Sequence, residues 1–326
     1  MKILLVRLSS LGDVLHNLPI VADILRHHPQ AQVDWVVEEA YVSLVKLNPH
    51  VRKVIPIALR RWRKGLGKAA VRAELRGFFR DLRAEQYDYV FDTQGLIKTG
   101  IVMACARVKP GGQKIGLANG TEDSGYEGIS RVFHSRSIPV APRTHAVARG
   151  RQVVAAALGY TVDTAPDFGL PAPGASGRKP WMPAGPYVVF FHGTARDAKK
   201  WPPSDWIALG RALAPLPVLL PWGSPREKED ASFLAAALPN ATVLPRLSMM
   251  DAVELARHAA LAVGVDTGLT HIAAAFLTPT VEIYVDSPRW KTEGNWSPRI
   301  VNLGDTGAAP DAATVLAAAR RLLETT

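Results

Sequence analysis

The sequence of 326 residues contains a single cysteine, Cys105, and no apolar run long enough to span a membrane. One cysteine excludes an internal disulfide, and the apolar helical surroundings of Cys105 predict a buried structural thiol rather than a nucleophile. The apolar run at the N-terminus is too short for a secretory signal, because Arg7 and Asp13 interrupt it. We therefore expect a protein of the cytoplasm.

The motifs of several common enzyme classes are also missing. The sequence has no G-x-x-x-x-G-K-[ST] phosphate loop, no H-E-x-x-H and no cluster of cysteine and histidine for zinc. Gly65-Leu-Gly67 lacks the third glycine of a dinucleotide fingerprint, because Ala70 stands in its place. Kinase, ATPase, dehydrogenase and metalloprotease functions therefore lack support.

Positive charge is in excess and unevenly placed. The chain has 39 Lys and Arg against 29 Asp and Glu, and 13 basic against 5 acidic residues lie between Arg60 and Lys114. Such a field predicts an anionic partner, either nucleic acid, an anionic membrane or a phosphorylated substrate. The segment Arg60-Arg-Trp-Arg-Lys64 is more densely charged than solubility requires, although a solvated helix face is the alternative. We expect no nucleic-acid partner, because no helix-turn-helix, aromatic RNA-binding pair or basic tail is evident.

Strand and helix patterns alternate along the chain in two series. The first series predicts strands over 2–7, 32–37, 52–57 and 87–92, and helices over 69–85 and 145–158. The second predicts strands over 187–191, 217–220, 241–244, 261–265 and 280–285, and helices from about 204, 226, 250 and 267. Six prolines and four glycines between Ala165 and Pro186 indicate a linker, 166–185. We predict an α/β protein of two Rossmann-like domains, 1–165 and 186–326, facing a cleft.

The turn from Arg7 to His16 follows the first strand and leads into a helix. Ser10 can cap that helix, Gly12 permits close approach of the backbone to a ligand, and Asp13 lies in the first helical turn, which favours a carboxylate. Open α/β sheets place their chemistry at such turns. Asp13 is therefore a candidate base, the alternative being that it only stabilises the start of the helix.

A second polar turn follows the strand 87–92. It offers Asp92, Gln94, Gly95 and Lys98, which we expect to line the same crevice as Asp13 because both turns follow the carboxyl end of a strand.

Three turns in the second half carry further chemistry. Residues 192–202 offer a hydroxyl and cations for an anionic group, residues 221–227 an aromatic ring and a carboxylate for a nucleoside, and residues 265–271 the first amides of a helix for phosphate oxygens. Each alone has a structural explanation, as core, buried histidine or surface charge. Together, at the ends of strands in one half, they predict a nucleotide diphosphate site formed by Thr194, Lys199, Trp222, Gly223, Glu227, Asp266, Thr267, Gly268 and His271.

In this order, the motifs resemble those of the bacterial lipopolysaccharide heptosyltransferases over nearly the whole chain. The matching segments are 9–16, 34–39, 60–64, 92–98, 145–149, 192–202, 221–227 and 265–271. The resemblance implies the GT-B fold and transfer, with inversion, of L-glycero-D-manno-heptose from ADP-heptose to a Kdo of Kdo2-lipid A. It further implies action at the cytoplasmic face of the inner membrane. We expect a monomer that is bound there peripherally, because the charges of the basic segment would hold it to anionic lipid.

The resemblance also assigns roles to residues. Asp13 would be the catalytic base, Lys199 and Thr194 would hold the diphosphate, Glu227 the ribose, and Asp266, Thr267, Gly268 and His271 the phosphates and heptose. From the position of the two turns and the charge of the basic segment, we expect the acceptor to contact Ser10, Gly12, Arg60, Arg61, Arg63, Lys64, Gln94 and Lys98. The chain departs from the family in two places: Ala195 replaces a frequent second threonine, and residues 118–130 lack an expected arginine.

Charge considerations define the mechanism that such residues would support. A hydroxyl attacking an anomeric carbon loses a proton while the leaving diphosphate gains negative charge, so a base and a group of cations are required. We expect no cofactor and no catalytic metal, because cations and amides suffice and no Asp-x-Asp motif stands in the candidate turns. The alternatives are a heptosyltransferase whose acceptor already carries a heptose, as in heptosyltransferase II, and a GT-B epimerase. Trp62 lies either at the level of lipid headgroups or in the core.

Overall fold

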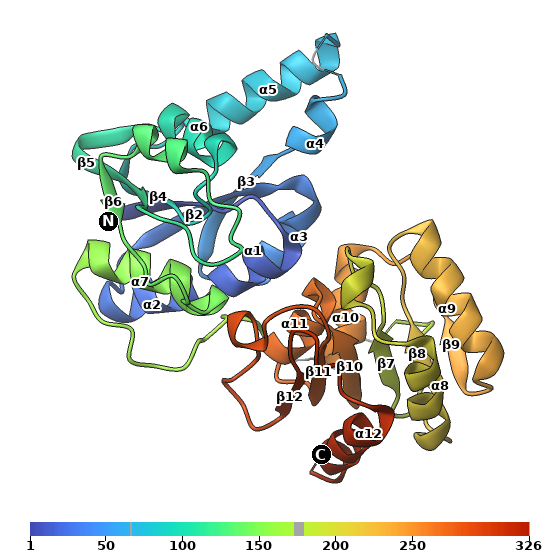
Figure 1. Ribbon diagram of the computed structural model, residues 1–326. Coiled ribbons are helices and arrows are strands. Elements are labelled where there is room, and N and C mark those ends of the chain that lie inside the picture. Colours follow the sequence, from blue (N-terminus) through green and yellow to red (C-terminus); the bar gives the residue numbers. More distant parts are fainter. Residues whose placement is uncertain (66, 173–178, 326) are drawn as a thin grey trace. The chain divides into compact units, whose positions relative to one another are not determined.

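The computed structural model describes residues 1–65, 67–172 and 179–325. It divides into two compact units, Met1–Leu170 and Pro171–Thr326 (Figure 1). The division falls inside the segment 166–185 that the sequence indicates as a linker; residues 173–178 of that segment lie outside the described residues. No helix in the described part of the chain is long and apolar enough to cross a bilayer.

The first unit is built on a sheet of six parallel strands in the order β3-β2-β1-β4-β5-β6. Its strands are β1 (Lys2–Val6), β2 (Gln32–Glu38), β3 (Val51–Ile57), β4 (Tyr87–Asp92), β5 (Val108–Leu117) and β6 (Arg136–Ile138). Its helices are α1 (Leu11–Asn17), α2 (Pro19–His27), α3 (Val42–Val45), α4 (Leu59–Trp62), α5 (Ala69–Leu82), α6 (Ile97–Cys105) and α7 (Ala146–Leu158), with short 3-10 turns η1 (Glu39–Tyr41) and η2 (Gly128–Phe133).

Alternating residues of β1 face two different helical layers. Ile3, Leu4, Leu5 and Val6 are all buried, as expected for a parallel sheet covered on both faces. One face packs against α4, α5 and α6, and α1, α2 and α7 cover the other (Figure 1). The hydrophobic core between the sheet and helices α4, α5 and α6 contains Leu4, Val6, Leu8, Val36, Ile55, Ile57, Trp62, Val71, Phe78, Leu82, Tyr87, Val90, Val102 and Met103.

The second unit repeats this strand order, β12-β11-β10-β7-β8-β9, with all neighbours parallel. The strands are β7 (Val188–Phe191), β8 (Val218–Leu220), β9 (Ala241–Val243), β10 (Leu261–Val265), β11 (Thr280–Tyr284) and β12 (Ile300–Gly304). The helices are α8 (Pro203–Ala212), α9 (Pro225–Ala237), α10 (Met249–Arg257), α11 (Gly268–Ala275) and α12 (Ala312–Glu324), with η4 (Asp197–Lys199) and η5 (Arg289–Lys291). One core of this unit is formed mainly by Val188, Phe190, Trp201, Trp206, Leu209, Val263, Val281, Ile283, Val315 and Leu322.

Both strand orders are that of a Rossmann fold, in which the chain reverses direction across the sheet after its third strand. The reversal places β1 beside β4 in the first unit and β7 beside β10 in the second. Ligands of open α/β sheets bind where two such neighbouring strands end. The turns predicted to carry the chemistry therefore stand at the switch points of the two sheets.

Most predicted elements are confirmed to within a few residues. The helix expected over 69–85 ends at Leu82, and β3, which contains Pro56, is an edge strand as expected. The sequence patterns missed the short helices α3 and α4 as well as β5, β6, β12 and α12.

Candidate functional site

In the first unit, the turns after β1 and β4 lie against each other. The backbone amide of Leu8 donates a 3.0 Å hydrogen bond to Gln94 Oε1. Ser9 Oγ accepts from Gln94 Nε2 at 3.5 Å and from Lys98 Nζ at 3.4 Å. The structure thus brings Gln94 and Lys98 to the turn that contains Ser10, Gly12 and Asp13, as the sequence predicts.

Asp92 fixes the conformation of the turn after β4 through hydrogen bonds to its backbone. Its buried carboxylate accepts hydrogen bonds from the amides of Gln94 and Gly95, at 2.9 and 3.0 Å, and from Thr99 Oγ1 at 2.9 Å. Gly95 adopts a φ of 73°, a backbone region that favours glycine. Asp92 and Gly95 therefore position Gln94 and Lys98 rather than present their own polar groups.

Asp13 is held from both sides of its carboxylate. Oδ2 accepts from the amide of Ser10 at 3.1 Å and from Ser10 Oγ at 2.9 Å, while Oδ1 pairs with Arg7 at 2.5 Å and with Arg149 at 3.8 Å. Partial burial by itself would raise the pKa of Asp13, but Arg7 and Arg149 outweigh it and hold the pKa well below the usual range. Asp13 is ionised at neutral pH, and 35% of its side chain remains exposed.

The basic segment divides into two parts. Arg61 pairs with Glu39 and Glu74, at 2.9 and 2.7 Å, and Trp62 is buried against Phe78 while its Nε1 donates to Glu74 at 2.7 Å. Trp62 is thus a core residue. The Arg61 guanidinium holds α4 to its surroundings, and a role for it in acceptor binding stays a prediction.

The remaining cations of the segment point to solvent. Arg60, Arg63 and Lys64 are exposed. Burial lowers the pKa of Lys98, Glu38 opposes this change, and the charges of Arg60 and Arg63 lower the pKa further. Arg60 and Arg63 therefore lie within electrostatic range of Lys98, which places them at the same edge of the sheet as Asp13.

In the second unit, β7 and β10 bring Lys199 and Asp266 into direct contact. Lys199 Nζ bonds to Asp266 Oδ2. Thr194, from the same loop as Lys199, is partly exposed, and the neighbouring Ala195 and Arg196 are exposed. The cation predicted to meet a diphosphate is therefore held in place by a carboxylate that follows the adjacent strand.

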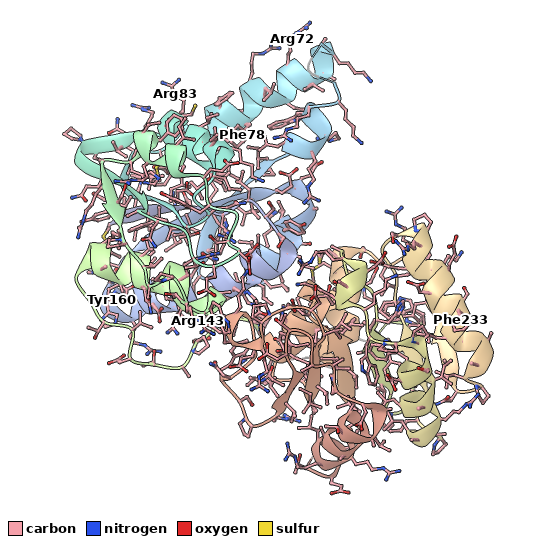
Figure 2. All side chains as sticks on the ribbon, in the orientation of Figure 1. Arg72, Phe78, Arg83, Arg143, Tyr160 and Phe233 are labelled. Carbon is pink, nitrogen blue, oxygen red and sulfur yellow. The ribbon has the colours of Figure 1, made fainter. Side chains whose placement is uncertain are left out.

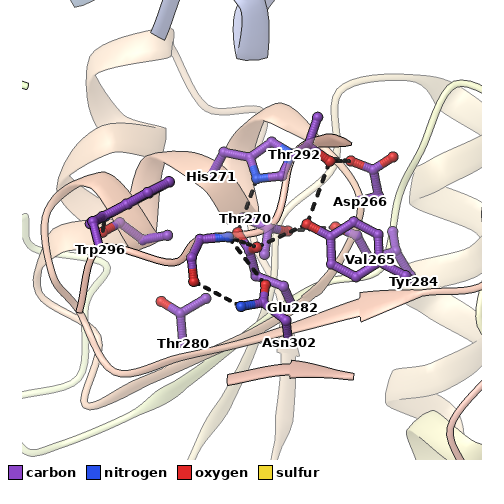
Figure 3. Close-up of polar contacts among 12 residues, drawn as sticks. Val265, Asp266, Thr270, His271, Thr280, Glu282, Tyr284, Thr292, Trp296 and Asn302 are labelled. Atoms are coloured by element: carbon purple, nitrogen blue, oxygen red, sulfur yellow. Dashed lines mark hydrogen bonds and ion pairs between the residues drawn. The ribbon is translucent and has the colours of Figure 1, made fainter. Parts of the chain in front are cut away.

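His271 lies between the carboxylates of Asp266 and Glu282 (Figure 3). Its Nε2 is 3.1 Å from Asp266 Oδ1, and its Nδ1 is 2.9 Å from Oε1 of the fully buried Glu282. Burial lowers the pKa of His271, but Glu282 and Asp266 outweigh it and raise the pKa to about 10. The ring is therefore an imidazolium at neutral pH.

Glu282 is satisfied on its other oxygen as well. Oε2 accepts from Tyr284 Oη at 3.0 Å and from the amide of Gly294 at 2.9 Å, and Thr292 Oγ1 donates to Asp266 at 3.2 Å (Figure 3). This network fixes the orientation of His271 and keeps its charge next to Lys199.

The helix α11 begins directly beside these charges. Thr267 is its extended N-cap residue and Gly268 its first residue, so its first amides are available to phosphate oxygens, as predicted. Gly264 lets the helix approach β10, because a Cβ there would lie 2.1 Å from Thr270 Oγ1. Thr270 Oγ1 donates to the carbonyl of Val265 at 2.8 Å.

The turn after β8 is organised by Glu227. Its Oε2 accepts from the amides of Gly223 and Ser224, at 2.6 and 3.0 Å, at the start of α9. Gly193 packs against this carboxylate, since a Cβ at that position would come within 3.0 Å of Glu227 Oε1. Trp222 Nε1 donates to the carbonyl of Leu244 at 2.7 Å, and Lys228 Nζ lies 5.2 Å from the ring centre. The turns after β7 and β8 therefore meet at Glu227.

Three participants were assigned no role from the sequence. Arg7 and Arg149 flank Asp13, and Glu282 supports His271. Glu282 had a visible signal, because a carboxylate in the middle of the apolar strand Thr280–Tyr284 is expensive to bury without a partner. Within residues 1–65, 67–172 and 179–325, no group of three or more His, Cys, Asp or Glu side chains could hold a metal ion.

Comparison with known proteins identifies the family. A model described as glycosyltransferase family 9 (heptosyltransferase) matches residues 75–316. The chain belongs to glycosyltransferase family 9. It is 41% identical over 287 residues to lipopolysaccharide heptosyltransferase 1 of Pseudomonas aeruginosa, covering 87% of this chain and 78% of that protein. It is 37% identical over 291 residues to the enzyme of the same name from Escherichia coli K12, covering 87% and 88%.

The solved structures agree with this assignment. The glycosyltransferase superposes on the E. coli heptosyltransferase WaaC with ADP at a TM-score of 0.83 and 32% identity, covering all of this chain and 99% of that one. The predicted GT-B architecture of two Rossmann-like sheets is thereby confirmed, and so is the predicted enzyme class.

Proposed function

We propose that this glycosyltransferase moves L-glycero-D-manno-heptose from ADP-heptose to a Kdo residue of Kdo2-lipid A, with inversion at the anomeric carbon. The observation that carries the proposal is the division of charge: an ionised Asp13 at one switch point, and Lys199 with the His271 imidazolium at the other. The names of the relatives at 41% and 37% identity support heptosyltransferase 1 as the specific activity.

The second unit is the proposed donor site. Lys199, His271 and the first amides of α11 would neutralise the diphosphate, whose negative charge grows as the sugar–phosphate bond breaks. The solved E. coli relatives contain ADP and ADP-2-deoxy-2-fluoro heptose, which supports a nucleotide-sugar donor here. Glu227 Oε1 would accept hydrogen bonds from the ribose hydroxyls, because Oε2 already accepts hydrogen bonds from the amides of Gly223 and Ser224. No metal ion is needed for this neutralisation.

The remaining donor contacts follow from the same loops. Trp222, which is partly exposed and fixed through its Nε1, would supply an apolar surface for the nucleoside, and the backbone of Gly223 would pass close to it. Thr194 would donate its hydroxyl to a phosphate oxygen. Ala195 offers no second hydroxyl there, so the proposed site relies more heavily on the cations.

The first unit is the proposed acceptor site, with Asp13 as the base. In a single displacement, the acceptor oxygen would form a bond to the anomeric carbon, the bond to the diphosphate oxygen would break, and the hydroxyl proton would pass to Asp13. A carboxylate with a lowered pKa is a weak base towards a neutral hydroxyl. Proton transfer therefore becomes favourable as the attacking oxygen acquires positive charge, late in the displacement.

Kdo2-lipid A is the more anionic of the two acceptors considered, the other being the product that already carries a heptose. The first unit has cations that could bind it. Lys98, Arg60 and Arg63 stand at the edge of the sheet near Ser9 and Gln94. Together with the exposed Lys64, which follows Arg63 in the chain, they would contact the phosphates and acid groups of the acceptor. Ser10 and Gly12 belong to the turn that would contact the reacting hydroxyl of the acceptor.

We further propose that the first unit binds an anionic membrane surface. Arg72 of α5 and Arg83, which directly follows α5, are both exposed (Figure 2), and their charges add to that of the basic segment. Lysines and arginines near anionic lipid contribute on the order of 1 kcal/mol each. Such a surface would hold the enzyme reversibly where its lipid acceptor lies.

An exposed apolar surface in the same unit supports membrane binding. Ile97 and Ile101 share one face of α6, and Ile129 and Val132 lie on η2; these four residues are 41–73% exposed. The two elements are in contact, because Gly100 leaves room for the ring of Phe133 and the amide of Ile97 bonds to Glu127 at 2.6 Å. Side chains of this kind enter the boundary between headgroups and acyl chains.

The test is a turnover assay with ADP-heptose and two acceptors, Kdo2-lipid A and the product that already carries one heptose. We expect release of ADP and formation of a heptosylated product with the first acceptor alone. Turnover only with the heptosylated acceptor would assign the protein to heptosyltransferase II, and turnover with neither would overturn the proposal.

A further inference from the structure

Two buried guanidinium groups share a single carboxylate at the end of β1. The side chains of Arg7 and Arg149 are 3% and 7% exposed, and both pair with Asp13 Oδ1. Among the described residues, Asp13 is the one carboxylate paired with either of them. The site therefore holds one more positive than negative charge in surroundings where water does little to screen it.

The guanidinium groups also have unused hydrogen-bonding capacity. Arg7 Nη1 donates to the carbonyl of Thr93 at 2.6 Å, but the buried Nε has no partner within the described part of the chain. Arg149 Nη1 donates to Thr121 Oγ1 at 3.0 Å, and its Nη2 is 3.8 Å from Asp13, beyond hydrogen-bonding distance. Arginine has five N–H donors, so both side chains have donors left to bind another anion.

A neighbouring arginine shows what a completed pair looks like. Arg151, two residues further along α7, makes two hydrogen bonds to Asp23, at 2.7 and 2.9 Å, and a third to the carbonyl of Thr164 at 3.0 Å. It is buried to a similar degree and its charge is fully matched. The unmatched charge at Arg7 and Arg149 is therefore specific to that site and is not a general feature of α7.

We propose that Arg149, together with Arg7, binds the sugar carboxylate of the acceptor, which supplies the missing negative charge next to Asp13. The inference rests on the proposed function, because it takes the acceptor to be an acid sugar. A guanidinium group binds a planar carboxylate through two parallel hydrogen bonds, which fixes the orientation of the ring that carries the reacting hydroxyl. Arg149 would thus bind the substrate and position it against the base.

Binding of this carboxylate has a consequence for catalysis. In the free enzyme, both guanidinium groups act on Asp13 alone and weaken it as a base. A second carboxylate would share their charge and add its own repulsion, which raises the affinity of Asp13 for a proton. Asp13 would then become a stronger base when the acceptor is in place.

The arrangement also bears on residues 118–130, which include the loop before η2. The sequence has no arginine among these residues, where the family resemblance leads one to expect it. Instead, Thr121 of the loop contacts Arg149, which comes from α7. An arginine side chain is thus present beside the loop from a different element of the fold.

The experiment combines a change in the enzyme with a change in the acceptor. Wild type, Arg149→Gln and Arg149→Lys are each assayed with the native acceptor and with its sugar carboxylates converted to methyl esters, at saturating donor. In the wild type, we expect esterification to lower kcat/KM by about 10- to 100-fold, the worth of a charged hydrogen-bonded pair. Arg149→Gln should lose a similar factor with the native acceptor, and esterification should lower its kcat/KM by a clearly smaller factor than in the wild type, while Arg149→Lys recovers part of the loss.

Arg151→Gln is the matched control on the same helix. It removes a buried arginine at a distance from the unmatched charge, so its sensitivity to esterification should equal that of the wild type. Independent, multiplicative effects of Arg149→Gln and esterification would overturn the proposal, as would full activity of Arg149→Gln. Should Arg149→Gln fail to fold, equal responses of Arg149→Lys and the wild type to esterification would overturn it. Failure of the proposed function is distinguishable, because the wild type would then not turn over the native acceptor at all.

Discussion

Glu282 lies 2.9 Å from His271 and is fully buried in the middle of β11. The carboxylate keeps a proton on the imidazole at neutral pH, so a second cation contacts Asp266 besides Lys199. Without the strand residue behind it, Asp266 alone would oppose the burial that lowers the pKa of this histidine. The charge of the proposed donor site thus depends on a residue from the interior of the sheet.

The first prediction concerns stability and pH. Because the pKa of His271 is raised from its ordinary 6.5 to about 10 in the folded chain, the imidazolium stabilises the fold fully below pH 6.5. That contribution should be lost progressively as the pH rises from 6.5 to about 10. Thermal unfolding followed at closely spaced pH values should show this decline; burial raises the pKa of Tyr284 well above 10, so its hydroxyl stays protonated there.

The Glu282→Gln variant tests the cause of this decline. Removal of one carboxylate should lower the pKa of His271, so the loss of stability should occur at lower pH and be smaller. At pH 7 we expect a destabilisation on the order of 1–3 kcal/mol, because a buried charge loses one of its two partners. Donor affinity should fall as well. A wild-type pH profile in this variant would contradict the assignment of the raised pKa to Glu282.

The second prediction concerns Asp13. Asp13→Ala should lower turnover by about 10²–10⁴-fold, the usual effect of removing a general base, and leave ADP-heptose binding nearly intact. Donor affinity measured by calorimetry and single-turnover rates would separate the two effects. Near wild-type turnover would return Asp13 to the role of a residue that only stabilises the start of α1.

The third prediction concerns Lys199. Lys199→Ala should weaken donor binding by about 10- to 100-fold and also slow transfer, because its charge meets a diphosphate that becomes more negative in the transition state. Lys200→Ala is the control, since Lys200 pairs with Asp230 at 2.7 Å and Asp197 at 3.3 Å instead. Equal effects of the two variants on donor affinity would show that general surface charge, and not Lys199, holds the diphosphate.

The fourth prediction separates the two parts of the basic segment. Replacing Arg60, Arg63 and Lys64 together by Ser should raise the acceptor KM and weaken binding to anionic vesicles, with donor affinity unchanged. Arg61→Ser should act mainly on thermal stability, because Arg61 is engaged by Glu39 and Glu74. A loss of acceptor affinity confined to Arg61→Ser would reverse these assignments.

The sequence predicts the fold well where hydrophobic periodicity is regular. It fails at β5, where Pro110, Gly111 and Gly112 have the composition of a turn. The structure accommodates them as an irregularity within the strand: Tyr87 pairs with Val108 but Tyr89 pairs with Gln113. Gly111 adopts a φ of 79°, a backbone conformation available mainly to glycine. Residue propensities cannot predict that three such residues remain within β5 because the strand pairs on both sides of them with β4.

The predicted site residues lie in segments that follow strands. Two of the three site residues that the sequence did not reveal, Glu282 and Arg149, lie elsewhere in the fold, in the strand β11 and the helix α7. Asp13, Gln94 and Lys98 are brought together because their turns follow adjacent strands, which the alternation of strands and helices indicates. Arg149 reaches Asp13 from α7, more than 130 residues away, and only tertiary packing brings these side chains together. A sequence pattern carries no information about such a contact.

Each of the two sheets described above carries its loops on a hydrophobic core of its own. Under the proposed roles, divergence of acceptor preference needs changes only in the loops after β1 and β4 and around α4, while nucleotide handling stays as it is. Related transferases that share a donor should therefore vary most in the first unit and keep the loops after β7, β8 and β10. Under the same roles, exchange of the whole first unit between such enzymes would transfer the acceptor preference along with it.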